Sequence, residues 1–324
     1  MIPKKIGICL NLKIYFMNNS FIAQVYKGKN SVGRYVAALF VIFIFWQLLG
    51  IIPLFAIASG YAPDSAAFME SMQSNFMGLG IPKSLYLAGL LFTFVFAFIG
   101  LYIAVTQIHG RSLKSVMTSR DKFDWTRVKF GFVLWGVVLL IMTIADLLIR
   151  PEDFVLIFDW QKFLVLAAVA IVLIPIQTTF EEVLFRGYFM QAIGGLTKNR
   201  WIPLILTSVI FGLVHGANPE IDKLGPLAFV FYIGTGFLFG IMTLMDEGME
   251  LSVGFHAVNN LFAALMITTD WMVFQTDAVF MDVSEPSISW QAFIPVFIVY
   301  PVILYFIGRR LSWTDWKAKL FGPI

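Results

Sequence analysis

The stretch FLVLAAVAIVLIPIQTTFEEVLFRGYF, residues 163–189, decides the fold class of this chain. An α-helix needs about 20 mostly apolar residues to cross the hydrocarbon core of a bilayer, and this stretch is long enough to do so. It nevertheless contains Glu181, Glu182 and Arg186. Because a charged side chain in mid-bilayer costs roughly 2.5 to 3.5 kcal/mol even on insertion scales, these three residues are candidates for function.

The rest of the chain has the same apolar character. Of its 324 residues 59% are hydrophobic and only 13% are charged, which is about half the charge of an ordinary soluble domain and excludes a soluble globule. The other predicted spans are 35–59, 85–106, 128–149, 201–215 (a short one), 226–245, 249–268 and 291–308. No strand-like alternation recurs, so the sequence predicts an all-α, polytopic membrane helix bundle with about eight transmembrane helices in one domain, residues 34–310.

The distribution of Lys and Arg predicts the orientation, because cytoplasmic loops carry an excess of both. Eighteen of the 23 basic residues fall on one side if both termini are cytoplasmic. Residues 1–33 are therefore expected to form a cytoplasmic N-terminal segment and residues 311–324 a cytoplasmic tail. The first 33 residues lack the layout of a cleavable signal peptide, and Met17 is an alternative start. The single Cys9 excludes an intramolecular disulfide and a zinc site built from several cysteines.

Within TTFEEVLFRGY, residues 178–188, the two adjacent glutamates must have different roles, because neighbouring side chains on a helix point about 100° apart. Glu182 and Arg186 are four residues apart in the order that favours an ion pair, which allows both to be buried. Glu181 then has no local cation, a setting that suits a general base. The alternative is that all three form a buried ion cluster that fixes helix packing.

Two further motifs place polar residues in predicted spans. FGLVH, residues 211–215, puts Phe211 and His215 on one helix face, and HAVNN, residues 256–260, does the same for His256 and Asn260. Each has a plainer interpretation: a lone His at a helix end is often a packing residue, and a His with an amide can be an interhelical hydrogen-bonded pair. The third histidine, His109, is expected at the surface of the basic loop 107–127.

Together the motifs supply the groups that hydrolysis needs. A carboxylate and an imidazole can activate water, and an imidazole with an amide can stabilise an oxyanion. A serine nucleophile is not supported, since no Gly-x-Ser-x-Gly motif surrounds Ser252. Glu181, His215 and His256 could instead bind zinc, but the His-Glu-x-x-His helix is absent. We therefore expect no required cofactor, with zinc as the alternative.

The ordered set E-E-x-x-x-R, F-x-x-x-H and H-x-x-x-N, on three separate spans within residues 160–270, resembles the CPBP family of intramembrane proteases. That family includes the type II CAAX prenyl endopeptidases, and its bacterial branch includes proteins linked to bacteriocin immunity. The resemblance implies an eight-helix bundle that cleaves a peptide bond near the cytoplasmic face of the cell membrane.

By similarity, Glu181 and His215 would activate the attacking water, and His256 with Asn260 would form the oxyanion hole. Glu182, Arg186 and Phe211 would support them, and a metal-free mechanism fits these parts better than a metallo-mechanism. The resemblance implies a peptide or membrane-protein substrate, with or without a lipid, and does not imply a farnesylated one.

Two other classes of function stay open. A non-enzymatic membrane scaffold or immunity factor on the same fold would tolerate loss of Glu181. A proton-coupled transporter should show broken helices in repeated halves, and the sequence has none. The basic loops are expected to contact anionic membrane lipids, and no nucleic-acid partner is needed to explain them. Gly236 and Gly240 fit close helix packing inside the bundle better than dimerisation.

The predicted span ends raise one difficulty about depth. Glu181 lies about 12 Å and His256 about 10 Å from the inner ends of their spans, whereas His215 lies about 21 Å from its own. A fifth span that begins deeper than residue 201, or that tilts strongly, is expected to reconcile these depths.

Overall fold

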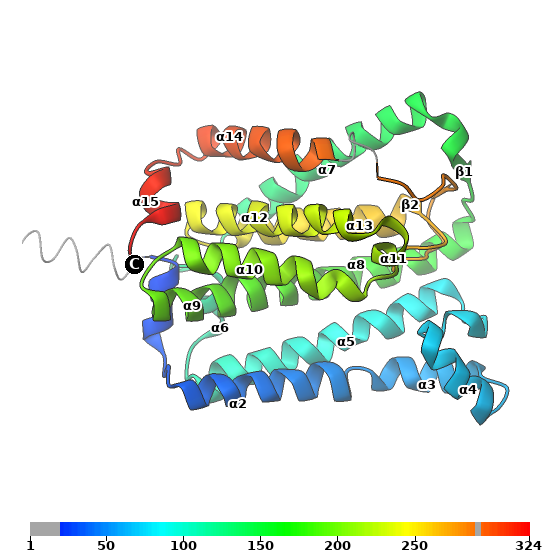
Figure 1. The fold of residues 1–324 in the computed structure, drawn as a ribbon, viewed down its shortest axis with the longest axis horizontal. Helices are drawn as coiled ribbons and strands as arrows, with labels where there is room; N and C mark the ends of the chain where they lie inside the picture. The colour runs from blue at the N-terminus through cyan, green and yellow to red at the C-terminus, as the bar shows by residue number, and fades with distance from the viewer. Residues whose placement is uncertain (1–19, 289–292) are drawn as a thin grey trace, which may run out of the picture.

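The computed structural model describes residues 20–288 and 293–324. Most of its helices run along the long axis of the molecule, with the C-terminus, α9 and α15 at one end and the strands and α11 at the other (Figure 1). Residues 1–19, with Cys9 and Met17, lie outside the described residues, and so do the first two residues of the predicted span 291–308.

In the described part of the chain, five continuous helical segments are long and apolar enough to cross a membrane. They are Val32–Tyr61, Lys83–Ile108, Trp125–Ile149, Trp160–Thr197 and Pro226–Asp246. Each contains one of the predicted spans, so the protein is an integral membrane protein built from helices.

These segments consist of α-helices joined by π-helical or 3-10 turns. Their elements are α2 (Val32–Phe43), η2 (Ile44–Leu49), α3 (Ile52–Tyr61), α5 (Lys83–Ile103), η5 (Ala104–Ile108), α7 (Trp125–Ile149), α8 (Trp160–Glu182), η7 (Val183–Phe189), α9 (Met190–Thr197), η9 (Pro226–Ala228) and α12 (Phe229–Asp246). The shorter elements are η1 (Ile22–Lys27), α4 (Ser65–Ser71), η3 (Met72–Ser74), η4 (Met77–Leu79), α6 (Leu113–Met117), η6 (Pro151–Asp153), α10 (Trp201–Val214), η8 (His215–Ala217), α11 (Pro219–Leu224), α13 (Glu250–Leu265), η11 (Pro295–Val299), α14 (Tyr300–Arg310) and α15 (Trp316–Phe321).

The other three predicted spans coincide with shorter helical segments, of which Trp201–Ala217 is apolar. They are α10 with η8, α13, and η11 with α14. Eight crossings and two cytoplasmic termini therefore stay a prediction.

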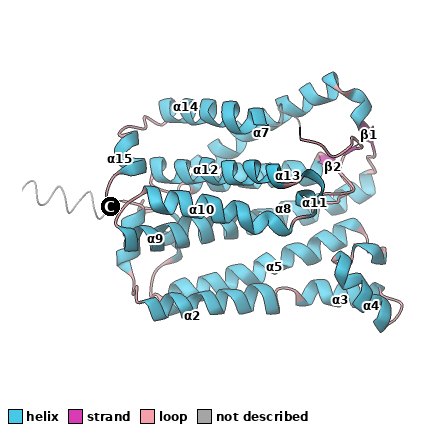
Figure 2. Ribbon diagram, in the orientation of Figure 1, coloured by secondary structure: helices cyan, strands magenta, loops and turns pink. Residues whose placement is uncertain are grey.

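The prediction of an all-α chain missed one small sheet. Strands β1 (Phe154–Leu156), β2 (Ile267–Thr268) and β3 (Phe280–Asp282) form it in the order β1-β3-β2 (Figure 2). β1 pairs with β3 antiparallel and β2 pairs with β3 parallel. Strands of two or three residues are too short to show the alternation by which strands are recognised in a sequence. The sheet joins the loops that follow α7 and α13 at the end of the bundle near α11.

Close helix contacts at glycines set the position of the central helices. α13 packs against α7 and α8, while α10 packs against α12. A Cβ at Gly254 of α13 would lie 2.1 Å from the carbonyl oxygen of Val128, and one at Gly236 of α12 would lie 2.7 Å from that of Ser208. Gly236 thus allows α10 and α12 to approach within the bundle, as the sequence predicted for the small-residue pattern.

Two arginines of the basic loop between η5 and α7 bind groups of the protein itself. Arg111 is buried, and its guanidinium donates to the carbonyl oxygen of Ser115 at 3.1 Å. Arg120 forms ion pairs of 2.8 Å with Asp246 and 2.9 Å with Glu250, at the turn between α12 and α13. These arginines attach the loop to the helices.

His109 corrects a prediction, because it is buried rather than at the surface. Its Nδ1 lies 2.7 Å from the carbonyl oxygen of Lys29 and its Nε2 lies 2.8 Å from the hydroxyl of Tyr188 in η7. A carbonyl oxygen only accepts, so Nδ1 carries the proton and Tyr188 donates to Nε2. Burial lowers the pKa of His109. This burial was not predictable, because the neighbours of His109 along the chain are mostly basic and polar.

Candidate active site

The E-E-x-x-x-R motif lies where α8 changes into the π-helical turn η7. Such turns are often found at functional sites, because they rotate side chains out of the regular helical register. Nη1 of Arg186 lies 3.0 Å from Oε1 of Glu182, and both side chains are 0% exposed. The predicted ion pair is therefore present and fully buried.

Aromatic rings from α10 and α12 contact the Arg186 guanidinium. Its central carbon lies 4.1 Å from the ring centre of Phe211 in α10 and 5.3 Å from that of Phe239 in α12. Nη2 also donates to the carbonyl oxygen of Gly236 at 3.4 Å. Phe211 thus contacts the buried cation directly through a cation–π interaction, which accounts for an aromatic residue in the F-x-x-x-H motif.

His256 of α13 lies between the two glutamates. Its Nδ1 is 3.0 Å from Oε1 of Glu182, and its Nε2 is 3.6 Å from Oε2 of Glu181. An ionised carboxylate only accepts hydrogen bonds, so Nδ1 is the donor to Glu182. The imidazole orientation is thereby fixed, with Nε2 turned toward Glu181.

Within its own helix Glu181 has no basic partner among the ion pairs of the described residues, since Arg186 pairs with Glu182. The sequence did not show that the His256 imidazole reaches Glu181 from α13. On the other side, Nε2 of Gln177 donates to Oε1 of Glu181 at 2.5 Å. Oε2 is buried and has no hydrogen-bond partner within residues 20–288 and 293–324.

A directional series of hydrogen bonds ends on Glu181. The indole Nε1 of Trp135 donates to Oδ1 of Asn259 at 3.1 Å, and Nδ2 of Asn259 donates to Oδ1 of Asn260 at 3.2 Å. Nδ2 of Asn260 then donates to Oε1 of Gln177 at 3.1 Å. Since an indole N–H can only donate, it sets the orientation of each amide that follows.

Sequence reasoning missed Gln177 and Trp135 as parts of this network. Gln177 was detectable in principle, because it is a polar residue in an apolar span and precedes Glu181 by four residues, on the same helix face. Trp135 carried no signal, since an aromatic residue in an apolar span is usually part of the core.

His215 lies one turn beyond Phe211, at the end of α10. Its Nδ1 is 2.6 Å from the carbonyl oxygen of Phe211, so Nδ1 carries the proton and Nε2 keeps its lone pair. Its ring lies 4.8 Å from the ring of Phe211, which in turn lies 6.0 Å from the ring of His256. Among the described contacts, the ring of Phe211 lies between His215 and His256, and no hydrogen bond or ion pair joins His215 to Glu181.

The difficulty about depth is reduced for Glu181 and His215 without a late start of α10, whereas His256 remains about 9 Å from the start of α13 at Glu250. α10 begins at Trp201, as the span 201–215 required, and not deeper. The helical segment that carries Glu181 instead continues beyond residue 189 to Thr197. Glu181 is thus about 24 Å along the helix from that end, which is similar to the roughly 21 Å between His215 and Trp201.

The zinc alternative receives no support from these positions. Across the described parts of the chain, no group of three or more His, Cys, Asp and Glu side chains is arranged to hold a metal ion. In particular, Nδ1 of His256 is already hydrogen-bonded to Glu182, and no hydrogen bond or ion pair of the described residues joins His215 to Glu181.

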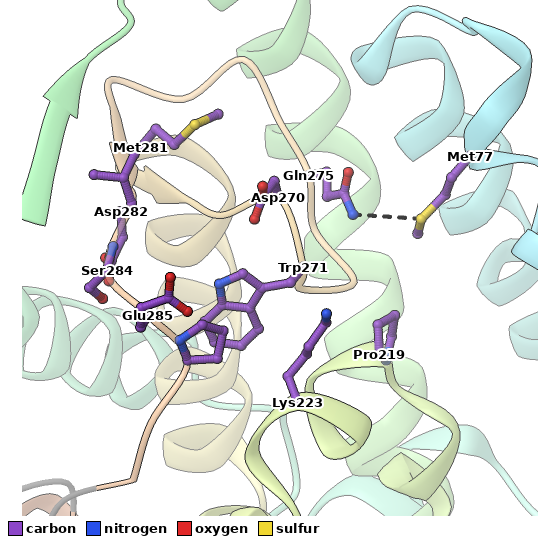
Figure 3. A pocket seen from close by; sticks show the side chains of 12 residues that line it. Met77, Pro219, Lys223, Asp270, Trp271, Gln275, Met281, Asp282, Ser284 and Glu285 are labelled. Atoms are coloured by element: carbon purple, nitrogen blue, oxygen red, sulfur yellow. Dashed lines mark hydrogen bonds between the residues drawn. The ribbon is translucent and has the colours of Figure 1, made fainter.

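A cavity of about 500 Å³ lies apart from the motifs, at the end of the bundle near the sheet. Figure 3 shows Trp271, Lys223 and Glu285 among its walls, with Gln275 hydrogen-bonded to the sulfur of Met77. None of the motif residues lines it. Cavity size therefore does not locate the candidate site; the buried polar side chains do.

Comparisons with known proteins agree with the motifs. Residues 160–262 match the family described as "Type II CAAX prenyl endopeptidase Rce1-like". The chain is also 33% identical over 306 residues to a Bacillus subtilis (strain 168) protein named "Uncharacterized protein YyaK", an alignment that covers 93% of this chain and 98% of that protein. No solved structure matches the chain. The matched segment carries all three motifs on buried or half-buried helices, and the chain belongs to the family of type II CAAX prenyl endopeptidase-like membrane proteins.

Proposed function

We propose that this protein is an intramembrane endopeptidase that hydrolyses a peptide bond near the cytoplasmic face of the cell membrane. Family membership supports a CAAX protease-like hydrolase in general. The observation that carries the proposal is Oε2 of Glu181, a buried carboxylate oxygen with no hydrogen-bond partner in the described chain. A buried acceptor without a partner costs about 1 to 3 kcal/mol, and a fold retains it where a substrate or water takes that place.

Glu181 is the proposed base. Its Oε1 is occupied by Gln177, so the carboxylate is held in one orientation and Oε2 is the oxygen that can accept a proton. His215 supports this role with a lone pair on Nε2, which its hydrogen bond to Phe211 leaves free. A base of this kind contributes typically 10²- to 10⁴-fold to a hydrolytic rate.

His256 and Asn260 are the proposed oxyanion donors. If both glutamates are ionised, the buried group carries two negative charges against the single positive charge of Arg186, and a proton on Nε2 of His256 balances them. His256 is then a donor at both ring nitrogens. Asn260 uses one hydrogen of its amide for Gln177, which leaves the second for the oxyanion.

The reaction balances without a covalent intermediate. The oxygen of water forms a bond with the carbonyl carbon while one of its protons moves to Glu181, and the carbonyl oxygen becomes an oxyanion. As the carbon–nitrogen bond breaks, that proton passes to the leaving amine, and Glu181 returns to its ionised form. Glu182 and Arg186 take no proton in this scheme and hold His256 in place.

The proposed substrate is a peptide or membrane protein, with or without a lipid, that reaches the site within the bilayer. We also propose that the exposed lysines contact anionic lipids of the cytoplasmic leaflet and that both termini are cytoplasmic. No cofactor is part of the scheme.

A panel of internally quenched peptides, lipidated and plain, tests the proposal with the purified protein in liposomes. We expect cleavage of at least one peptide, loss of cleavage in Asn260→Leu, and no effect of a chelator. Loss of activity with the chelator would instead favour a zinc enzyme. If Asn260→Leu is folded and cleaves as the wild type does, the assigned oxyanion hole is wrong.

A further inference from the structure

Glu220 of α11 is a buried carboxylate that none of the three motifs includes. Its exposed fraction is 4%, and no Lys, Arg or His of the described chain forms an ion pair with it. The other buried acids differ in this respect: Glu182 pairs with Arg186, Glu250 with Arg120, and Glu181 faces His256. A buried anion without a cation is costly unless hydrogen bonds compensate it.

Three donors surround the Glu220 carboxylate. The hydroxyl of Tyr232 and Nδ2 of Asn218 both donate to Oε1, the latter at 3.0 Å. The backbone N–H of Val273 donates to Oε2 at 3.2 Å. The carboxylate therefore joins α11, α12 and the loop after β2, next to Trp271 and the cavity of Figure 3.

Tyr232 connects this carboxylate to His215. The two rings are stacked, with centres 4.3 Å apart and planes at 21°. Since Nδ1 of His215 is bound to the carbonyl oxygen of Phe211, the carbonyl and the Tyr232 ring together fix the direction of Nε2.

We infer that Glu220 and Tyr232 are positioning residues for His215, an inference that rests on the proposed function. The stacked ring holds the imidazole, and the bond from its hydroxyl to Glu220 holds the ring. As Nε2 of His215 accepts a hydrogen bond from the attacking water, the imidazole gains partial positive charge, which the electron-rich face of Tyr232 attracts. Donation of the hydroxyl to a carboxylate increases the negative charge on that ring.

The three donors require a carboxylate at this position. A glutamine at position 220 could accept from Tyr232 and Asn218 at its carbonyl oxygen, but its amide nitrogen would face the backbone N–H of Val273, so Glu220→Gln removes the charge together with one hydrogen bond. The charge has a use if a positive charge develops on His215 during the reaction.

Nuclear magnetic resonance of ¹⁵N-labelled histidine rings tests the inference without any need for activity. The chain contains only three histidines, and a His215→Gln variant identifies the His215 signals. We expect His215 to carry its proton on Nδ1, and we expect Glu220→Gln and Tyr232→Phe to shift its signals. The matched control Asp222→Asn, an exposed acid on the same helix, should leave them unchanged. Unchanged signals of the other two histidines show that each variant is folded.

Kinetics on a cleaved peptide give the second readout. Glu220→Gln and Tyr232→Phe should lower kcat about tenfold or more while KM changes little, and Tyr232→Leu, which removes the stacked ring, should lower kcat further. His215 signals that do not respond to either substitution would overturn the inference even if the protein is an active protease. If the wild type cleaves nothing, the proposed function fails, and the ring signals alone decide whether these residues position His215.

Discussion

Removing the buried Arg186 guanidinium should destabilise the protein far more than removing a comparable exposed one. The Glu182–Arg186 pair joins two side chains with no exposed surface at 3.0 Å. Arg186→Met leaves the Glu182 carboxylate buried with His256 as its remaining charged neighbour. Breaking a buried pair in this way typically costs about 3 to 5 kcal/mol, because the remaining charge is uncompensated.

The chain contains a matched control for this substitution. Arg150 and Asp146 have the same four-residue spacing and a separation of 3.3 Å, but their side chains are 49% and 48% exposed. Arg150→Met should therefore lower the free energy of unfolding by no more than about 1 kcal/mol. Unfolding by SDS in mixed micelles, followed by tryptophan fluorescence, measures both variants.

A double variant separates the charge from the loss of packing. Glu182→Gln with Arg186→Met removes both charges and still offers His256 an acceptor, so it should recover most of the stability that Arg186→Met loses. The reasoning is refuted if Arg186→Met costs no more than Arg150→Met, or if the double variant is no more stable than Arg186→Met alone.

Three further substitutions test other parts of the structure. The pKa of His109 is lowered in the folded protein, so the unfolded chain binds more protons as the pH falls through about 6.5, and the free energy of unfolding decreases toward low pH. In His109→Gln, the decrease in unfolding free energy between pH 7.5 and pH 5 should be smaller than in the wild type. Gly236→Val should lower the free energy of unfolding by about 1 to 3 kcal/mol, because the added side chain meets a backbone oxygen of α10. The control Gly60→Val should not lower it, because no atom lies within 4 Å of a Cβ at that position. Equal effects of the two substitutions would contradict the assigned contact. Trp135→Phe leaves Oδ1 of Asn259 without its donor, so the free energy of unfolding should decrease by about 1 to 3 kcal/mol in the same assay. The substitution should also lower kcat more than it changes KM. An unchanged kcat would show that the series of amides does not act on Glu181.

Much of the architecture could be predicted from the chain because a bilayer restricts it to long apolar helices. The Glu182–Arg186 pair was predictable for the same reason, since a four-residue spacing on one helix is local information. The contacts between helices were not predictable. His256 reaches both glutamates from another helix, and only the fold shows that its imidazole lies beside Glu181.

The missed features share a physical cause. His109 and Glu220 are buried by segments distant in the sequence, so their own neighbours gave no sign of burial. The depth of Glu181 was misjudged because helix α9 continues its apolar span through glycine-containing turns that resemble a helix end. The small sheet was too short to produce a pattern.

The central claim is that Glu181 activates the attacking water. The most direct test is the cleavage rate of a peptide substrate by Glu181→Gln in liposomes, compared with the wild type and with Glu152→Gln, an exposed glutamate outside the site. The account predicts a loss of about 10²-fold or more in Glu181→Gln and an unchanged rate in Glu152→Gln. A folded Glu181→Gln protein that cleaves at the rate of the wild type would contradict the claim.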